Sequence, residues 1–143
     1  MNTAPRDSHR EVATPRPGER TTLRVPARSA YLGLVRTVVA SLAAQSDFSV
    51  DDIEDLRMAA DEAAALLMSG AHPDAQLDVA IDVQQDGLAI TVSAPSTGIS
   101  ISTDSFAWTV LSTLADTAEH VTRGTTTTIA VTKRRTDDLP PLT

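Results

Sequence analysis

The sequence contains no cysteine, very few aromatic residues and no long apolar run. The absence of cysteine excludes a disulfide framework, thiolate chemistry and any zinc site that uses sulfur ligands. With one Trp, one Tyr and two Phe in 143 residues, a core has to be built mainly from Ala, Val, Leu and Ile. No segment approaches the roughly 20 apolar residues of a membrane-spanning helix, and the N-terminus has no signal-peptide pattern. We therefore expect a soluble, cytoplasmic protein without a membrane partner.

Basic charge is also scarce. Lys and Arg number 12 against 19 Asp and Glu, which gives a formal net charge of −7. An acidic surface repels phosphates, so a direct nucleic-acid partner is not expected. The only imidazoles, His9, His72 and His120, are widely spaced, and no metal site is expected.

The hydrophobic patterns divide the chain into one central domain and two tails. Residues 1–20 are polar and locally basic and predict a disordered tail; residues 134–143 are polar and proline-rich and predict a flexible one. Residues 21–133 form the predicted domain. Its periodicities predict, in order, a strand at 21–26, helices at 29–45 and 49–70, hairpin strands at 77–83 and 88–94, a helix at 104–117, and strands near 120–121 and at 125–133. This order predicts an α+β fold, a two-layer sandwich of about three helices on one mixed or antiparallel sheet.

The longest helical pattern, from Ser49 to Gly70, has two faces of different character. Ser49 is suited to cap the helix, and the acids that follow suit its positive end. One face is apolar and is expected in the core. The opposite face carries Asp55, Glu62 and Leu66, with Glu62 one turn from Leu66. The function depends on what this second face does.

Two helices offer candidate partner-binding residues. In the helix at 29–45, the stripe of Tyr31, Leu34, Val35, Val38 and Leu42 is expected in the core, and Leu32, Arg36 and Val39 lie on a second, mixed face. Arg36 fits either a helix flank whose stem covers apolar surface or an anchor in an interface. In the helix at 104–117, the stripe of Phe106, Val110, Leu111 and Leu114 is expected in the core. Trp108 lies off this stripe and fits either a half-buried edge or a binding anchor.

Four segments of the chain, in their order along it, resemble segments of the RsbW-type anti-sigma factors, which are serine-protein kinases of the GHKL ATPase superfamily. IEDLRMAADEAAALL looks like the family's N-box helix, and SFAWTVLSTLAD like the helix after its second glycine-rich box. TTTTIAVTK is similar to the closing Gly-Thr strand, and LVRTVVASLAAQ fits the first helix. The resemblance covers about residues 21–133 and implies a GHKL (Bergerat) fold with a nucleotide site beside the N-box helix.

The resemblance also assigns roles to individual positions. Glu62 matches the acidic N-box residue that is associated with catalysis. The Asn that ligates Mg²⁺ in the family would fall at Leu66, and the Asp that contacts adenine at Ala94. Leucine offers no oxygen to a cation that needs oxygen ligands, and alanine offers no acceptor to the adenine amine.

The family's glycines are replaced as well. They would fall at Ser96, Ser105 and Ala107, where side chains stand in place of a close backbone approach to phosphates. The remaining cofactor-binding candidates are Gly98, Gly124 and Thr125. We therefore expect no cofactor, with ATP and Mg²⁺ relevant only if residual nucleotide binding survives.

The leading hypothesis is an anti-sigma factor that inhibits a cognate sigma factor and is released by an anti-anti-sigma partner. The resemblance further implies a homodimer. The alternative is an ATP-dependent serine/threonine kinase that acts on the anti-anti-sigma antagonist. A third possibility is an α+β scaffold domain unrelated to transcription.

Overall fold

A computed structural model describes residues 14–96 and 100–136. Most of the two predicted tails, and Gly98 among the candidate residues, lie outside these ranges. The elements in chain order are β1 (Arg20–Pro26), the short 3-10 helix η1 (Ser29–Tyr31), α2 (Leu32–Gln45), α3 (Val50–Met68), β2 (Gln76–Val83), β3 (Gly87–Pro95), α4 (Phe106–Leu114), β4 (Thr117–Arg123) and β5 (Thr126–Arg134).

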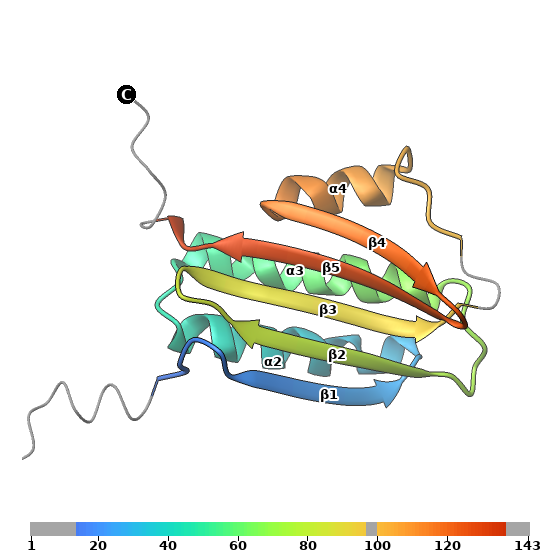
Figure 1. The fold of residues 1–143 in the computed structure, drawn as a ribbon, viewed down its shortest axis with the longest axis horizontal. Coiled ribbons are helices and arrows are strands. Elements are labelled where there is room, and N and C mark those ends of the chain that lie inside the picture. Colours follow the sequence, from blue (N-terminus) through green and yellow to red (C-terminus); the bar gives the residue numbers. More distant parts are fainter. Residues whose placement is uncertain (1–13, 97–99, 137–143) are drawn as a thin grey trace, which may run out of the picture.

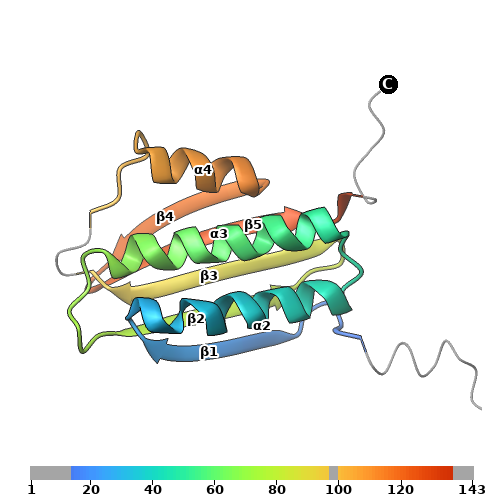
Figure 2. The same cartoon turned by 180° about the vertical axis from the view of Figure 1, so that it is seen from behind.

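The strands form one five-stranded sheet in the order β1-β2-β3-β5-β4, and every neighbouring pair is antiparallel. Helices α2, α3 and α4 all lie on one face of this sheet, behind it in Figure 1 and in front of it in Figure 2. The predicted α+β sandwich of three helices on one sheet is therefore confirmed. No helix in the described ranges is both long and apolar enough to cross a bilayer.

The β2–β3 hairpin follows the predicted alternation. The inward row of β2 is buried, and Val83 pairs with Leu88 across the hairpin. Gly87 begins β3 beside β5, where a Cβ atom would lie 2.1 Å from the carbonyl oxygen of Lys133. Only glycine lets the two strands approach this closely, which explains the glycine of the Asp-Gly turn.

The core lies between the sheet and α3. Helix α3 presents mostly small residues to β3 and β5, so its backbone can lie close to the strands. Its buried residues are Asp52, Leu56, Ala59, Ala60, Ala63, Ala64 and Leu67. The predicted aliphatic core is confirmed, with Phe48 and Trp108 as its buried aromatic residues.

Two boundaries differ from the predictions. Helix α4 begins at Phe106 and ends at Leu114 rather than covering 104–117, because the Ser105 side chain caps it and Ala115 has extended backbone angles. β4 consequently starts at Thr117. At the N-terminal side, Glu19 already pairs with Val83, so strand pairing begins before Thr21.

Candidate functional site

The second face of α3 turns toward α4 and β5. The Ser49 side chain accepts a hydrogen bond from the Asp52 amide at 3.1 Å, which confirms the predicted cap. Asp55, seven residues before Glu62 and on the same side of the helix, lies 3.6 Å from Lys133 of β5. Helix α4 packs beside α3, as Figure 2 shows. Glu62 and Leu66 therefore border the space between these two helices.

The geometry around Glu62 offers little for catalysis. Glu62 is half-buried, and no hydrogen bond or ion pair joins it to another described residue. One turn later, Leu66 is partly buried and packs against the core. Among the described residues, no three His, Cys, Asp or Glu side chains lie close enough to hold a metal ion.

The end of β3 and the β4–β5 turn come together, as a nucleotide site of this kind would require. The Ser96 amide donates to the Thr125 carbonyl at 2.6 Å, and the Ser96 hydroxyl donates to the Gly124 carbonyl at 3.4 Å. Gly124 occupies the first position of a two-residue turn with a φ of 59°, which glycine adopts without strain. Ala94, where the resemblance would place the adenine-contacting Asp, is 3% exposed and belongs to the core.

The N-terminus of α4 is capped by Ser105. The Ser105 hydroxyl accepts from the Trp108 amide at 3.1 Å, so the serine that replaces a family glycine stabilises the helix end. Ala107 follows in the first turn and is half-buried.

The structure decides between the two alternatives for Trp108. Its side chain is 7% exposed and meets the ring of His120 on β4 edge-to-face, with ring centroids 5.0 Å apart. This contact fastens α4 to the sheet, so Trp108 packs in the core and is not a surface anchor. The helix is rotated relative to the predicted stripe, and Phe106, expected in the core, is the exposed residue, at 83%.

The prediction for Val39 is also wrong. Val39 is fully buried, because Val35, Val39 and Ala43 recur every four residues and form the inward stripe of α2. Leu34, expected in the core, is 48% exposed instead.

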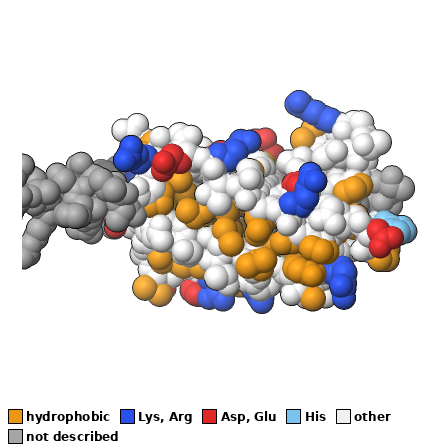
Figure 3. All heavy atoms as spheres, turned by 90° about the horizontal axis from the view of Figure 1, so that it is seen from below, with side chains coloured by type: hydrophobic (Ala, Val, Ile, Leu, Met, Phe, Trp, Pro, Cys, Tyr) orange, Lys and Arg blue, Asp and Glu red, His pale blue; other side chains and the backbone are white. Residues whose placement is uncertain are grey.

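Leu32 and Arg36 remain at the surface. Leu32 is half-buried, and the Arg36 side chain is 42% exposed and lies 3.4 Å from Asp61 of α3. Seen from below, the molecule shows apolar side chains gathered over β1 and α2 (Figure 3). These two residues therefore stay candidates for partner contact.

Sequence reasoning missed a buried charge cluster around Lys133. Its side chain is 12% exposed; the ammonium donates to the Leu114 carbonyl at 3.2 Å and lies 3.6 Å from Asp55 and 3.8 Å from Asp52. The sequence does indicate that Lys133 is buried, because alternation along β5 places it in the inward row after Thr127, Ile129 and Val131.

Asp52 is the buried acid of this cluster. Burial alone would raise its pKa, but hydrogen bonds from the Thr136 hydroxyl and amide, the charge of Lys133 and the Ser49 hydroxyl outweigh burial and lower the pKa. The cluster ties α3, α4, β5 and the residues after β5 together, so its role is structural.

Residues 25–133 match the family of histidine kinase-like ATPase domains. The chain belongs to this family. As a histidine kinase-like ATPase domain, it is 38% identical over 95 residues to the anti-sigma-F factor RsbW of Mycobacterium tuberculosis (strain H37Rv), which covers 66% of this chain and 56% of that relative. It is 30% identical over 77 residues to the serine-protein kinase RsbW of Bacillus cereus (strain AH187), which covers 52% of this chain and 48% of that relative.

The fold has a solved counterpart. A crystal structure of the RsbU and RsbW domains of a Mycobacterium tuberculosis protein superposes with a TM-score of 0.60 at 16% identity, over 80% of this chain and 32% of that one. These comparisons confirm the predicted resemblance to RsbW-type proteins. The chain spans about half the length of the curated relatives it matches.

Proposed function

We propose that this chain is a cytoplasmic anti-sigma factor that binds and inhibits a cognate alternative sigma factor without using ATP chemistry. An anti-anti-sigma protein would release the sigma factor by competing for the chain. The names of its relatives and its membership of the ATPase-domain family support the first part of this proposal.

One observation carries the second part: neither of the two positions most needed for nucleotide chemistry has a polar side chain, and their side chains pack in or against the core. Ala94 is 3% exposed, and Leu66 packs against the core. Without a carboxylate at position 94, adenine loses a charge-assisted hydrogen bond of about 1.5–3 kcal/mol. Without an oxygen at position 66, Mg²⁺ loses a protein ligand that could not be replaced by a methyl group.

The charge of the helix layer fits a basic client. Helices α2 and α3 carry six carboxylates, of which that of Asp52 is buried, against two guanidinium groups, those of Arg36 and Arg57. Opposite charges on two proteins accelerate their encounter, and repulsion between like charges disfavours acidic competitors. Sigma factors bind DNA, which requires a basic surface. The partner contact is proposed on α2, through the half-buried Leu32 and the Arg36 side chain, which is 42% exposed.

The test measures binding of the purified chain to each alternative sigma factor encoded by the same genome, by calorimetry with and without Mg²⁺-ATP. One sigma factor should bind and lose its transcription activity, with an affinity that nucleotide does not change. Arg36→Glu should weaken binding about tenfold or more, whereas Arg57→Glu, the same charge change at a side chain of similar exposure (40% against 42%), should have little effect.

The second candidate function is the serine/threonine kinase that acts on the antagonist, which the name of the Bacillus cereus relative favours. Incubation with radiolabelled ATP, Mg²⁺ and the anti-anti-sigma protein separates the two. Transfer of phosphate to the antagonist, abolished by Glu62→Gln, would establish the kinase and overturn the nucleotide-free proposal. Equal effects of Arg36→Glu and Arg57→Glu would remove α2 from the contact surface.

A further inference from the structure

The chain leaves the sheet through three consecutive basic residues, Lys133, Arg134 and Arg135, and the next residue is Thr136. No other serine or threonine in the sequence directly follows three basic residues. Thr136 is exposed and lies beyond the end of β5. We infer that Thr136 is a phosphorylation site for a separate serine/threonine protein kinase that recognises basic residues before its target. A phosphate at Thr136 releases the residues after β5 from α3.

The basic charge that such a kinase recognises is accessible on Arg134. Kinases select their substrates partly by charge pattern. The Arg134 side chain is exposed, and no carboxylate in the described ranges pairs with its guanidinium group; its backbone amide is what donates to Asp116, at 2.7 Å. An acidic subsite of a kinase can therefore bind this guanidinium group without breaking a contact of the fold.

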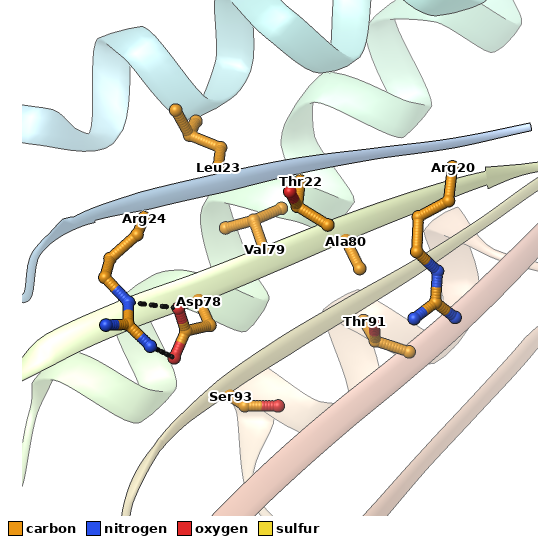
Figure 4. A pocket seen from close by; sticks show the side chains of 9 residues that line it. All are labelled: Arg20, Thr22, Leu23, Arg24, Asp78, Val79, Ala80, Thr91 and Ser93. Atoms are coloured by element: carbon orange, nitrogen blue, oxygen red, sulfur yellow. Dashed lines mark hydrogen bonds and ion pairs between the residues drawn. The ribbon is translucent and has the colours of Figure 1, made fainter.

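A second threonine with arginine neighbours is held inside the sheet. Thr22 lies on β1 between Arg20 and Arg24, beside a hollow of about 420 Å³ on the open face of the sheet (Figure 4). The two guanidinium groups donate to Asp82 and Asp78, at 2.6 and 2.7 Å, so their charge is already paired. Unlike this threonine, the one after β5 lies outside the strands and has unpaired basic charge beside it.

Thr136 also makes a structural contact that a phosphate would remove. Its hydroxyl and its backbone amide both donate to the Oδ2 atom of Asp52, which lies in the first turn of α3. The Asp52 side chain is only 8% exposed, so water can do little to replace these two donors. The contact therefore fixes the residues after β5 to the N-terminus of α3.

The neighbouring residue, Arg135, fastens two further parts of the fold. Its guanidinium group donates to the carbonyls of Ser46 at 3.3 Å and Gln85 at 2.6 Å, and it lies over the Phe48 ring, 6.0 Å from the centroid. Arg135 and Thr136, which we call the clasp, thus join the N-terminus of α3, the corner between α2 and α3, and the β2–β3 turn.

Phosphorylation changes both the hydrogen-bond donor and the charge at this contact. The Oγ1 atom of Thr136 forms a bond to the γ-phosphorus of ATP as the bond from that phosphorus to the β–γ bridging oxygen breaks. ADP leaves, and the hydroxyl proton passes to the catalytic Asp of the kinase. The product has no hydroxyl donor and carries a charge of about −1.5 to −2.

The surroundings of Asp52 are poorly suited to this new charge. Lys133, the nearest cation, is already shared between Asp52 and Asp55, at 3.8 and 3.6 Å. The first two turns of α3, where the helix dipole favours negative charge, already hold four carboxylates: Asp51, Asp52, Glu54 and Asp55. Repulsion between the phosphate and Asp52 therefore opens the clasp.

Incubation of the full 143-residue chain with Mg²⁺, radiolabelled ATP and each serine/threonine kinase encoded by the same genome tests the site. One kinase should label the chain, and peptide mass spectrometry should place the phosphate on Thr136. Thr136→Val should abolish the label. Arg134→Ala should lower kcat/KM for phosphorylation at least about tenfold, whereas Arg123→Ala, at an exposed arginine of β4, is the matched control and should leave it unchanged.

Hydrogen exchange of the phosphorylated chain tests the release of the clasp. Amides at the start of α3 and at the corner before it should exchange at least about tenfold faster than in the unmodified chain, while those of the central strand β3 should keep their protection. Thr136→Val removes the hydroxyl donor without adding charge and should have a smaller effect.

Three results would overturn the inference. The first is the absence of phosphate from Thr136 with every kinase, and the second is an equal rate for Arg134→Ala and Arg123→Ala. The third is unchanged exchange at the start of α3 after phosphorylation. Labelling with ATP alone would overturn the assignment to a separate kinase. No sigma factor enters these measurements, so a failure of the anti-sigma proposal would leave their outcomes unchanged.

Discussion

Replacing Lys133 by Met should destabilise the fold through a loss of charge, because Met keeps the length and the apolar stem. The Lys133 side chain is 12% exposed, and its ammonium group donates to the Leu114 carbonyl at 3.2 Å, a charge-assisted bond of about 1.5–3 kcal/mol. Its removal also leaves Asp52, 8% exposed at its side chain, without the nearest cation. Removing one partner of a buried pair costs about 3–5 kcal/mol when nothing else supports the charge that remains.

Asp52 keeps other support. Its carboxylate still accepts from the amide and hydroxyl of Thr136 after the substitution. We therefore expect a loss in the free energy of unfolding of about 2–3 kcal/mol at pH 7, below the full cost of an unsupported buried charge. Urea unfolding followed by far-UV circular dichroism measures this loss. Arg134→Met, at the exposed neighbouring position, is the control and should change stability by less than about 0.5 kcal/mol.

The pH dependence distinguishes a loss of charge from a loss of packing. The pKa of Asp52 is lowered in the folded state, so its carboxylate contributes stability that is present above the unfolded value near pH 4 and is lost as pH falls through the lower folded pKa. Lys133 is one of the groups that lower it. The difference between the unmodified chain and Lys133→Met should therefore shrink below about pH 4. A difference that stays constant from pH 7 to pH 3, or equals that of Arg134→Met, would refute the reasoning.

The remaining predictions concern two glycines and the single tryptophan. Gly87→Ala should destabilise by about 3 kcal/mol or more, since its Cβ would meet the Lys133 carbonyl at 2.1 Å. Gly33→Ala, whose Cβ would lie 3.6 Å from the flexible end of Arg36, should be neutral or stabilising by up to about 1 kcal/mol. Equal effects in urea titrations would contradict this assignment. Trp108→Ala should cost about 3–5 kcal/mol, and in the unmodified chain the fluorescence of Trp108 should resist iodide quenching and change little when a partner binds.

The sequence predicts the elements of this fold well wherever local periodicity is clean. The alternation of β2 and β3 and the Ser49 cap of α3 all appear in the structure as expected. The rotations of α2 and α4 could not be predicted in the same way. Both helices are apolar around much of their circumference, so periodicity does not decide which stripe meets the sheet. For this reason the sequence pattern places Val39 on the mixed face and Leu34 in the core, and it leaves Trp108 open between a half-buried edge and a binding anchor.

In the candidate site, too, local features could be predicted from the sequence and long-range contacts could not. The tight turn at Gly124 and Thr125 is a local consequence of the sequence, whereas the pairing of β3 with β5 that brings it beside Ser96 joins residues 28 positions apart. The Lys133 cluster joins residues about 80 positions apart, and only the packing of α3 against β5 brings them together. A lone lysine at the end of a strand carries no local signal of a buried partner, although its inward register was visible.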